Sequence, residues 1–316
     1  MQGMRLTFTK CHGSGNDFAL FDARETRLSD AEWGRIARTL CDRAGPVGAD
    51  GLLLLGEAGD GAAFAQMVVN ADGSIPETCL NGLRCTARAG FEALGIEAAT
   101  VRLKTSDAQV AHDPELASGV YTVRTTVGPA STDPRAAGIN LAAPAIEARI
   151  PGLPSARAFT AVAMPNPHLI TFVDQVDIAE LTALGDWCEA GPALLADRAN
   201  VSFVELRPDG LYVHTYERGV GLTNACGTAM GAATHVAGLT GRIPFGQWIT
   251  VHNPGGRVRT RAEGPEGGDA VTIAGNATFE WDAQIEIDPA TGVLDELTVT
   301  RRRDDEVAAW ASLRAG

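Results

Sequence analysis

The sequence has 316 residues, of which 45% are hydrophobic and 21% charged, as in an ordinary globular protein with room for two domains. Its formal net charge of −13 disfavours nucleic acid as a partner, because an acidic surface repels phosphate groups. No apolar run approaches the roughly 20 residues that span a bilayer, and the start of the chain lacks a signal-peptide pattern. We therefore expect no membrane partner and a cytoplasmic location.

In the first half of the chain, short apolar runs bounded by Gly, Asn or Asp predict strands. The first run follows a glycine-rich turn and covers 16–22, and the next two cover 49–55 and 64–70. A stretch of small residues from Asn81 to Leu94 predicts a helix that ends at Gly95. Gly and Pro near residue 128 mark the point where we expect the chain to leave the first lobe.

The second half repeats this order at a separation of about 150 residues. Strand-like runs at 166–174, 200–204 and 211–216 precede a Gly- and Ala-rich helix, which is predicted to run from Gly227 to Ala237 and to end at Gly238. Three pairs that recur in the same order favour duplication: Asn16 with Asn166, Asp42-Arg43 with Asp197-Arg198, and Cys79 with Cys226.

The predicted fold class is α/β, in the broad α+β sense, with two pseudo-symmetric lobes. Each lobe is a mixed, mostly antiparallel sheet wrapped around a central helix, and the active site is expected in the cleft between the lobes. The N-terminal lobe is predicted to span 1–128 plus 279–316, because the strand-like run 279–287 returns to it, and the C-terminal lobe spans 129–278. The basic run 301–303 is cancelled by the acidic residues 304–306, so we predict a solvated tail.

Six cysteines are present, at positions 11, 41, 79, 85, 188 and 226. A chain of this size needs no disulfide staples, and no pair of cysteines has the spacing of a zinc site. Cys79 and Cys226 each follow a glycine-containing loop and precede a predicted helix, so we interpret them as reactive thiols. Cys85 lies inside the first helix and is interpreted as core, and Cys11, Cys41 and Cys188 as filler.

The position of two thiols at helix N-termini predicts acid–base chemistry. Such an end presents unpaired N–H groups and a partial positive charge, which lower the pKa of a thiol and bind carboxylates. Two facing ends can invert an amino-acid α-carbon, since one thiolate removes the proton and the other thiol returns a proton on the opposite side. The N–H groups of 80–82 and of Gly227 and Thr228 would stabilise the developing negative charge. We therefore expect no cofactor, neither a metal nor pyridoxal phosphate.

These residues lie in motifs that resemble the diaminopimelate epimerase family over most of the chain. The first active-site segment is similar to 70–74 with 79–85, and the second is similar to 217–221 with 225–228. Further signatures match 12–18, 166–168 and 200–201. The resemblance implies interconversion of LL- and meso-diaminopimelate for lysine and peptidoglycan synthesis, with Cys79 and Cys226 as the acid/base pair. Only the stretch after about Asp288 looks like an addition.

The resemblance also implies the other residues of the site. His168 and Glu217 would assist the two thiols. The family's substrate ligands correspond to Asn16, Asn70, Asn166, Asn200, Glu217 and Arg218, and the helix-end residues Leu80, Asn81, Gly227 and Thr228 complete the predicted substrate site. Arg218 is also suited on its own chemistry to bind a distal carboxylate with its two-pronged guanidinium, and asparagines supply neutral donors and acceptors.

Two positions depart from the family pattern. Leu80 stands where the family usually has Gly, and Leu222 stands where it usually has Glu. A larger side chain at the helix start narrows the space there, and the change at position 222 removes a carboxylate. We expect these differences to affect substrate choice and rate more than the two-thiol reaction.

The sequence leaves three alternatives open. The chain could be a racemase of another amino acid, such as histidine or proline, or an amino-acid-binding relative without turnover. It could also be a redox sensor whose thiols oxidise to a disulfide, although we interpret such oxidation as inactivation. In each enzymatic case the partner is a small amino-acid substrate, and a homodimer is expected only because relatives are often dimers.

Overall fold

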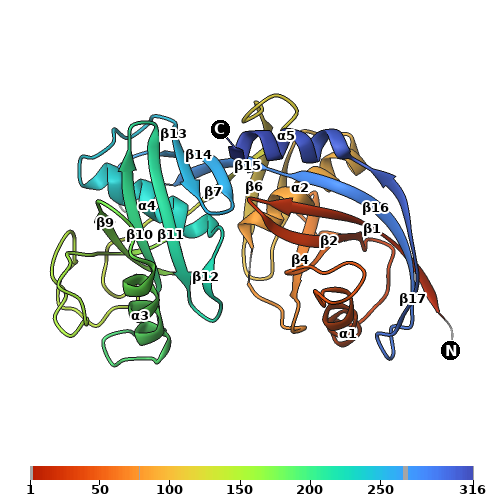
Figure 1. Ribbon diagram of the computed structural model, residues 1–316, viewed down its shortest axis with the longest axis horizontal. Helices are drawn as coiled ribbons and strands as arrows, with labels where there is room; N and C mark the ends of the chain where they lie inside the picture. Colours follow the sequence, from red (N-terminus) through yellow and green to blue (C-terminus); the bar gives the residue numbers. More distant parts are fainter. Residues whose placement is uncertain (1–2, 78, 266–269, 316) are drawn as a thin grey trace. The chain divides into compact units, whose positions relative to one another are not determined.

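The computed structural model describes residues 3–77, 79–265 and 270–315 of the chain (Figure 1). Parts of the two predicted lobes lie outside that range, namely residues 1–2, 78 and 316 of the first and 266–269 of the second. The chain divides into two compact units: unit 1 comprises Met1–Thr125 with Gly275–Gly316, and unit 2 comprises Thr126–Ala274. Within the described ranges, no helix has both the length and the apolar character needed to cross a membrane.

In the described part of unit 1, two helices and most of the strands lie in the first 127 residues, and two further strands and a third helix lie near the C-terminus. Its elements are β1 (Met4–Gly13), β2 (Asn16–Asp22), α1 (Asp30–Leu40), β3 (Gly51–Gly56), β4 (Phe64–Asn70), α2 (Leu80–Leu94), β5 (Ala98–Arg102), β6 (Asp107–Asp113), β7 (Thr122–Val127), β16 (Thr278–Ile287), β17 (Leu294–Arg302) and α5 (Asp304–Ala315). β16, which covers the run 279–287, pairs antiparallel with β1.

The strands of unit 1 follow a mixed but mostly antiparallel order. β2 is antiparallel to β1 and parallel to β3, and β3 is antiparallel to β4. β4 is parallel to β5, which continues antiparallel into β6 and β7. The parallel step from β2 to β3 is bridged by α1, as a parallel pair requires a crossover connection.

Unit 2 repeats this order strand for strand. Its elements are β8 (Thr160–Ala163), β9 (Pro167–Val173), α3 (Ile178–Glu189), β10 (Asn200–Arg207), β11 (Gly210–Glu217), β12 (Gly221–Thr223), α4 (Gly227–Leu239), β13 (Ile249–Asn253), β14 (Gly256–Ala262) and β15 (Val271–Asn276). β8 and β9 are antiparallel, β9 and β10 parallel, β10 and β11 antiparallel, β11 and β13 parallel, and β13 to β15 antiparallel. The short strand β12 is the one insertion in this series. The predicted class of two pseudo-symmetric lobes is therefore confirmed.

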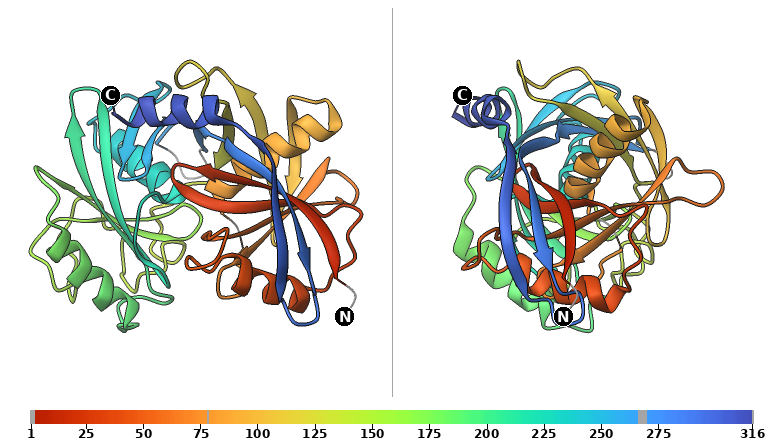
Figure 2. Two further views of the ribbon diagram at one scale, coloured as in Figure 1. Left: turned by 45° about the vertical axis from the view of Figure 1, so that its right-hand side comes forward. Right: turned by 90° about the vertical axis from the view of Figure 1, so that its right-hand side faces the viewer.

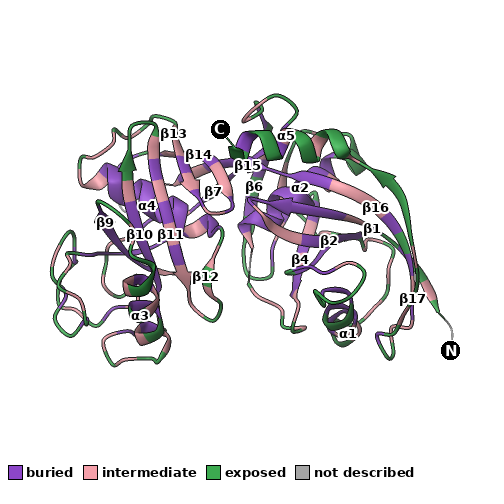
Figure 3. Ribbon diagram, in the orientation of Figure 1, coloured by how far each residue is buried: buried purple, intermediate pink, exposed green. Residues whose placement is uncertain are grey.

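Each unit encloses one helix within its sheet. α2 packs against β1 to β6, and α4 packs against β8 to β11 and β14. All residues of α4 from Gly227 to Gly238 except Thr228 are buried, as Figure 3 shows along the helix. A helix that is apolar and small on every side is typical of a fully surrounded position, because strands can approach it from all directions.

A second helix in each unit covers the outer face of the sheet. α1 begins with a capping box, in which Ser29 and Glu32 each accept from the other's backbone N–H, and it buries Trp33, Ile36 and Leu40 against Phe21. In unit 2, α3 is capped by Asp177 and buries its apolar residues in the corresponding core. These outer cores hold the ends of the strands in place, where the polar residues of the site lie.

The helix predicted from Gly227 to Ala237 in the second half of the chain is two residues longer than expected. α2 ends at Gly95 as expected, with that residue in the left-handed conformation (φ 68°). α4 instead continues through Gly238 to Leu239. Gly238 is needed for packing rather than for a turn, because a Cβ there would lie 2.7 Å from the ring of Phe245.

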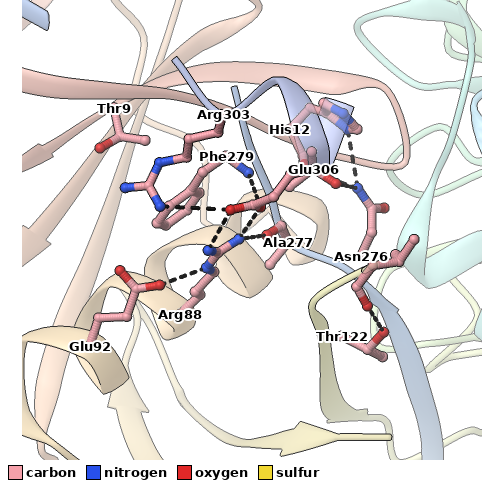
Figure 4. Close-up of polar contacts among 12 residues, drawn as sticks. Thr9, His12, Arg88, Glu92, Thr122, Asn276, Ala277, Phe279, Arg303 and Glu306 are labelled. Carbon is pink, nitrogen blue, oxygen red and sulfur yellow. Dashed lines mark hydrogen bonds and ion pairs between the residues drawn. The ribbon is translucent and has the colours of Figure 1, made fainter. Parts of the chain in front are cut away.

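The prediction of a solvated tail is also wrong. β17 pairs antiparallel with β16 (Figure 2), and α5 buries Trp310 and Leu313 against Val120. Arg303 donates to Asp282 at 3.1 Å and Glu306 accepts from Arg88 of α2 at 2.9 Å (Figure 4). Arg303 and Glu306 also form an ion pair with each other at 3.7 Å, so these two charges belong to a network with the body of unit 1 rather than to a solvated tail.

Candidate active site

Cys79 stands at the entrance of the central helix of unit 1. It is the N-cap of α2, in an extended conformation (φ −140°, ψ 106°), and its side chain makes no capping bond. The Cys79 thiol donates to Oδ1 of Asn16 at 3.4 Å. The thiol is half-buried, so it lies at a helix N-terminus with access to small molecules.

The loop that carries Asn16 is fixed by charged residues at the starts of β2 and β3. Asn16 donates to Asp50 at 2.6 Å, and Arg43 bridges the carboxylates of Asp50 and Asp17. Burial alone would raise the pKa of Asp17, but hydrogen bonds from Arg43 and Lys10 outweigh it and lower the pKa to about 2. Asn16 is thus oriented through its amide group, with its oxygen left to face Cys79.

The other predicted residues of unit 1 lie around the same end of the sheet. Asn70 is the last residue of β4, pairs with Gly51 of β3 and donates to Ser74. Asn81 is buried in the first turn of α2, and its Oδ1 accepts from Arg84 at 3.1 Å. Leu80 is also buried, at 8% exposure. The register of β2 to β4 and the start of α2 therefore bring these side chains to one end of the unit.

Cys226 occupies the equivalent position in unit 2. It is the N-cap of α4, again extended (φ −117°, ψ 112°) and again without a side-chain capping bond. Its sulfur lies 3.4 Å from Oγ1 of Thr228 and accepts from the backbone N–H of Ala229. Burial and the nearby Glu217 carboxylate raise the pKa of Cys226 well above its ordinary value, so this sulfur holds its proton.

Glu217 is the acidic neighbour of Cys226. It ends β11 and accepts hydrogen bonds from the hydroxyl of Thr223 and from the thiol of Cys226. Burial raises the pKa of Glu217, while these two hydrogen bonds act in the opposite direction. The pair is arranged so that a proton can pass between the sulfur and the carboxylate.

His168 is a buried polar residue on β9, one of the two parallel strands β9 and β10 of unit 2. It lies opposite Asn200 in the β9–β10 register and is 1% exposed. Its Nε2 is 3.0 Å from Oδ1 of Asn166 and 3.5 Å from Nδ2 of Asn200. Burial and then the charge of Arg218 lower the pKa of His168 to about 3, so the imidazole is neutral.

Arg218 follows Glu217, and its backbone and its side chain bind different residues. Its backbone N–H donates to Oδ1 of Asn200 at 2.9 Å, and its guanidinium binds the carboxylate of Asp197. The guanidinium is about one-quarter exposed. Unit 2 therefore groups Asn166, His168, Asn200, Glu217, Arg218 and the Cys226–Thr228 segment at the ends of three strands and one helix.

Comparisons with known proteins show the family of the chain. The family model of diaminopimelate epimerase matches residues 8–126 and 160–279. A diaminopimelate epimerase of Listeria innocua is 38% identical over 303 residues, covering 93% of this chain and 92% of its own. One from Lactiplantibacillus plantarum is 38% identical and covers 87% of this chain and 88% of its own. The chain belongs to the diaminopimelate epimerase family.

The fold is also found in solved structures of low sequence identity. A hydroxyproline epimerase from Agrobacterium vitis superposes with a TM-score of 0.63 at 16% identity and covers 99% of this chain and 98% of its own. A Bacillus anthracis phenazine biosynthesis protein of the PhzF family gives a TM-score of 0.64 at 14% identity, covering 89% and 99%. Membership of the epimerase family makes the chain an isomerase. The family match ends at residue 279, so β17 and α5 lie beyond it.

Leu80 and Leu222, the two departures from the family pattern, differ in burial. Leu80 is buried in the first turn of α2, whereas Leu222 is 43% exposed and pairs with Tyr216 across β11 and β12. The neighbouring Thr223 supplies the hydroxyl that Glu217 accepts from. Position 222, where the resemblance implies a carboxylate, therefore carries an exposed apolar side chain, with the neutral hydroxyl of Thr223 one residue further on.

Three residues near the thiols were not predicted from sequence. Asp197 holds the guanidinium of Arg218, Thr223 holds Glu217, and Arg84 is a fully buried cation in α2. Asp197 had been noted only as one member of a repeated pair. Arg84 lies within the segment 79–85 that resembles the family. Its long, positively charged side chain among the small residues of the predicted helix was a further signal. The described residues contain no group of three or more His, Cys, Asp or Glu placed to hold a metal.

Proposed function

We propose that the chain interconverts LL- and meso-diaminopimelate by a cofactor-independent reaction in which Cys79 and Cys226 act as opposed base and acid. The observation that carries the proposal is the equivalence of the two thiols. Each is the extended N-cap of the helix that its unit encloses, in two units with the same strand order. A two-base inversion needs two such groups, one for each face of the α-carbon.

The helix ends supply the electrostatic part of the reaction. Removing the α-proton places negative charge on the substrate's α-carboxylate, and the first N–H groups of a helix have no partner within it. The N–H groups at the starts of α2 and α4 are therefore proposed to bind this carboxylate, through Leu80, Asn81, Gly227 and Thr228. Removing one such donor from an oxyanion site raises a barrier by roughly 3–4 kcal/mol.

The protonation states favour one starting arrangement. Cys226 holds its proton because it is buried beside Glu217, so it is proposed as the acid. Cys79 is half-exposed at a helix N-terminus, so it is proposed as the base in the direction of reaction in which Cys226 is the acid. The roles exchange when the reaction runs in reverse. After this transfer Cys79 is a thiol and Cys226 a thiolate: Cys79 releases its proton to solvent, and Glu217 is proposed to pass a solvent proton back to Cys226. Neutral His168 is proposed to assist as an uncharged hydrogen-bond partner.

The polar residues of unit 2 suit a substrate with a second amino-acid group. We propose that the distal carboxylate binds Arg218 and shares its guanidinium with Asp197. Asn166 and Asn200 already contact His168 and the Arg218 backbone, so their amides are fixed in orientation. Asn16 and Asn70 are proposed as further neutral ligands. A substrate without a distal charged end, such as proline, leaves Arg218 without a role.

We further propose that the enzyme works in the bacterial cytoplasm as a homodimer that serves lysine and peptidoglycan synthesis. Support comes from the bacterial relatives that carry the family name. Native mass spectrometry of the full chain tests the dimer, and a monomer at micromolar concentration would contradict it.

The test of the reaction is exchange of the α-proton in D₂O with LL-diaminopimelate. The wild-type chain is expected to incorporate solvent deuterium at the α-carbon and to form the meso isomer. Cys79→Ala and Cys226→Ala are each expected to lower epimerisation by at least about 10³-fold, since each removes one of the two proton-transfer groups.

The same assay with histidine and proline separates the alternatives. Exchange with either of these and not with diaminopimelate would assign a different racemase activity. Binding of diaminopimelate without any exchange would identify a relative that has lost turnover. Normal turnover in either cysteine variant would contradict the two-base assignment.

A further inference from the structure

Arg84 is a buried cation that forms no ion pair with a carboxylate in the part of the chain that the structure describes. It lies on the second turn of α2 and is 0% exposed. By residue volume it is the largest of the fully buried side chains in the described part of the chain. All of its hydrogen bonds go to neutral acceptors, and among the residues that the structure describes no acceptor contacts its Nη1. A buried charge without a counter-charge is expensive, so a purely structural role would be served better by an apolar side chain.

The hydrogen bonds of Arg84 join three segments around Cys79. Its Nη2 donates to Oγ of Ser14 at 2.9 Å and to Oδ1 of Asn81 at 3.1 Å, and its Nε donates to the carbonyl of Asn276 at 3.0 Å. Ser14 belongs to the turn before β2, and Asn81 to the first turn of α2. Arg84 therefore ties that turn to the helix start.

The contact between the turn and the helix is unusually close. A Cβ added to Gly13 would lie 2.4 Å from the carbonyl oxygen of Asn81 and 3.0 Å from Nη2 of Arg84. The same turn leads directly to Asn16, whose Oδ1 accepts from the Cys79 thiol. Any movement of Arg84 is thus passed to both the sulfur and its acceptor.

The charge of Arg84 also reaches the thiol. Burial lowers the pKa of Arg84 to about 10, and the nearby Cys85 and Cys79 act in the opposite direction, as negative charge on either sulfur would. Arg88, one turn further along α2, provides the contrast, because it is paired with Glu306 and Glu92 (Figure 4). One helix thus carries one neutralised and one unneutralised buried arginine, and the unneutralised one lies nearer the thiol.

We propose that Arg84 is a positioning residue for Cys79: it holds the thiol and its Asn16 acceptor in place, and its unpaired charge stabilises the thiolate. The inference rests on the proposed function, in which Cys79 is one of the two acid/base thiols. The titratable and charged groups that face this assembly are Cys79 and Cys85 on α2, His12 on β1, and the Lys10, Asp17, Arg43 and Asp50 cluster behind Asn16.

The experiment measures alkylation of each cysteine by iodoacetamide in the full chain between pH 5 and pH 10, by peptide mass spectrometry. In Arg84→Met, labelling of Cys79 at pH 7 is expected to be about tenfold slower and its midpoint to move to higher pH. In Arg84→Lys, which keeps the charge, most of the wild-type rate is expected to return. Cys226 lies in the other unit, is buried and holds its proton, so it is expected to label slowly and at the same rate in wild type and in every variant.

Arg88→Met is the matched control. It removes an equally buried arginine from the same helix, so it is expected to lower thermal stability and to leave the pH profile of Cys79 unchanged. Buried Cys85 reports folding in every sample, because it labels only in unfolded chains. If Cys85 labels in Arg84→Met, Arg84→Gln takes its place, since the amide can still donate to Ser14 and Asn81.

Two results would overturn the inference: a Cys79 profile in the neutral Arg84 variant that coincides with wild type, or an equal displacement in Arg88→Met. Turnover supplies a second readout, for which we expect a lower kcat with KM within about twofold. Alkylation reports the thiolate even in a chain without turnover. A failure of the Arg84 inference is therefore distinguishable from a failure of the two-thiol mechanism, which the cysteine variants test.

Discussion

Two buried histidines show how single residues of this chain are kept neutral. Burial lowers the pKa of His168 to about 3 and that of His12 to about 4. In His12 the nearby Asp17 acts in the opposite direction, and Arg84 adds to the effect of burial. His12 contacts Asn276 and the backbone of Gly15, so it shapes the turn beside Arg84 and lies next to Trp310 of α5.

The low pKa of His12 predicts a specific pH dependence of stability. The unfolded chain takes up a proton on this imidazole near pH 6.5, whereas the folded chain does so only near pH 4. The unfolded state therefore binds more protons between these values, and the free energy of unfolding falls as pH falls from about 6.5 to about 4, by about 3 kcal/mol for this group. His12→Gln is expected to reduce that slope in urea titrations, and the part contributed by His168 remains.

The control and the window make this prediction specific. His112→Gln replaces an exposed imidazole on β6 of the same unit and serves as the matched substitution for comparison. Asp17, whose folded pKa is about 2, contributes stability that is lost only below about pH 3.8, outside the histidine window. An unaltered slope in His12→Gln between pH 4 and pH 6.5 would contradict the assignment.

At the scale of elements, the two enclosed helices depend on small residues where strands approach them. A Cβ at Gly90 of α2 would lie 2.5 Å from the ring of Phe64, and one at Gly82 would lie 2.6 Å from Leu53. The helix is thus placed by close contact with the strands, and its first turn, with Cys79 at the N-cap, is placed with it.

Gly90→Ala tests this packing through the sign of its effect. Helix propensity alone would make the change stabilising by about 1 kcal/mol. The clash with Phe64 is expected to reverse this and to destabilise the chain by about 1–3 kcal/mol in urea unfolding. Ala93→Gly, at an exposed position of the same helix, measures propensity alone and is expected to destabilise by about 1 kcal/mol. A Gly90→Ala variant more stable than wild type would contradict this prediction, because it would mean that Phe64 of β4 moves aside at little cost.

At the scale of the whole chain, the C-terminal segment beyond the family match completes unit 1. α5 places Glu306 over the guanidinium of Arg88, which also stacks on the rings of Tyr121 and Phe279. Glu306 additionally accepts from the backbone N–H of Phe279 at 3.2 Å. The last helix of the chain thus neutralises a cation of the enclosed helix α2 (Figure 4).

Glu306→Gln is expected to destabilise the full chain by about 3 kcal/mol, because it leaves Arg88 buried without its main counter-charge. Glu92→Gln removes the other partner of Arg88, which is 46% exposed, and is expected to change stability by less than about 0.5 kcal/mol. Urea midpoints of the two variants provide the comparison. Equal effects would mean that α5 adds nothing to the neutralisation of Arg88.

Much of this architecture could be predicted from sequence because it depends on local patterns that recur. The strand runs, the helix from position 81 to 94 with its terminal Gly95, and the two cysteines at helix starts are all properties of neighbouring residues. Their repetition in the same order predicted two pseudo-symmetric lobes, which the strand order of units 1 and 2 confirms. The family followed from the same motifs.

What failed were predictions about long-range partners. The acidic and basic residues at 301–306 cancel locally, which indicated a solvated tail, but Arg303 and Glu306 bind Asp282 and Arg88 far away in the sequence. Gly238 looked like a helix end, but it lies within α4 because Phe245 packs on it.

The sequence by itself thus determined the strands and the helix that recur in each half, the duplication, and the position of a cysteine at the start of each recurring helix. These features depend on consecutive residues and on their repetition. Only the tertiary structure decided which charges are paired and which are left alone. Arg84 and Arg88 lie one turn apart on the same helix, and only the folding of α5 and of the 13–16 turn against that helix makes one of them neutralised and the other not.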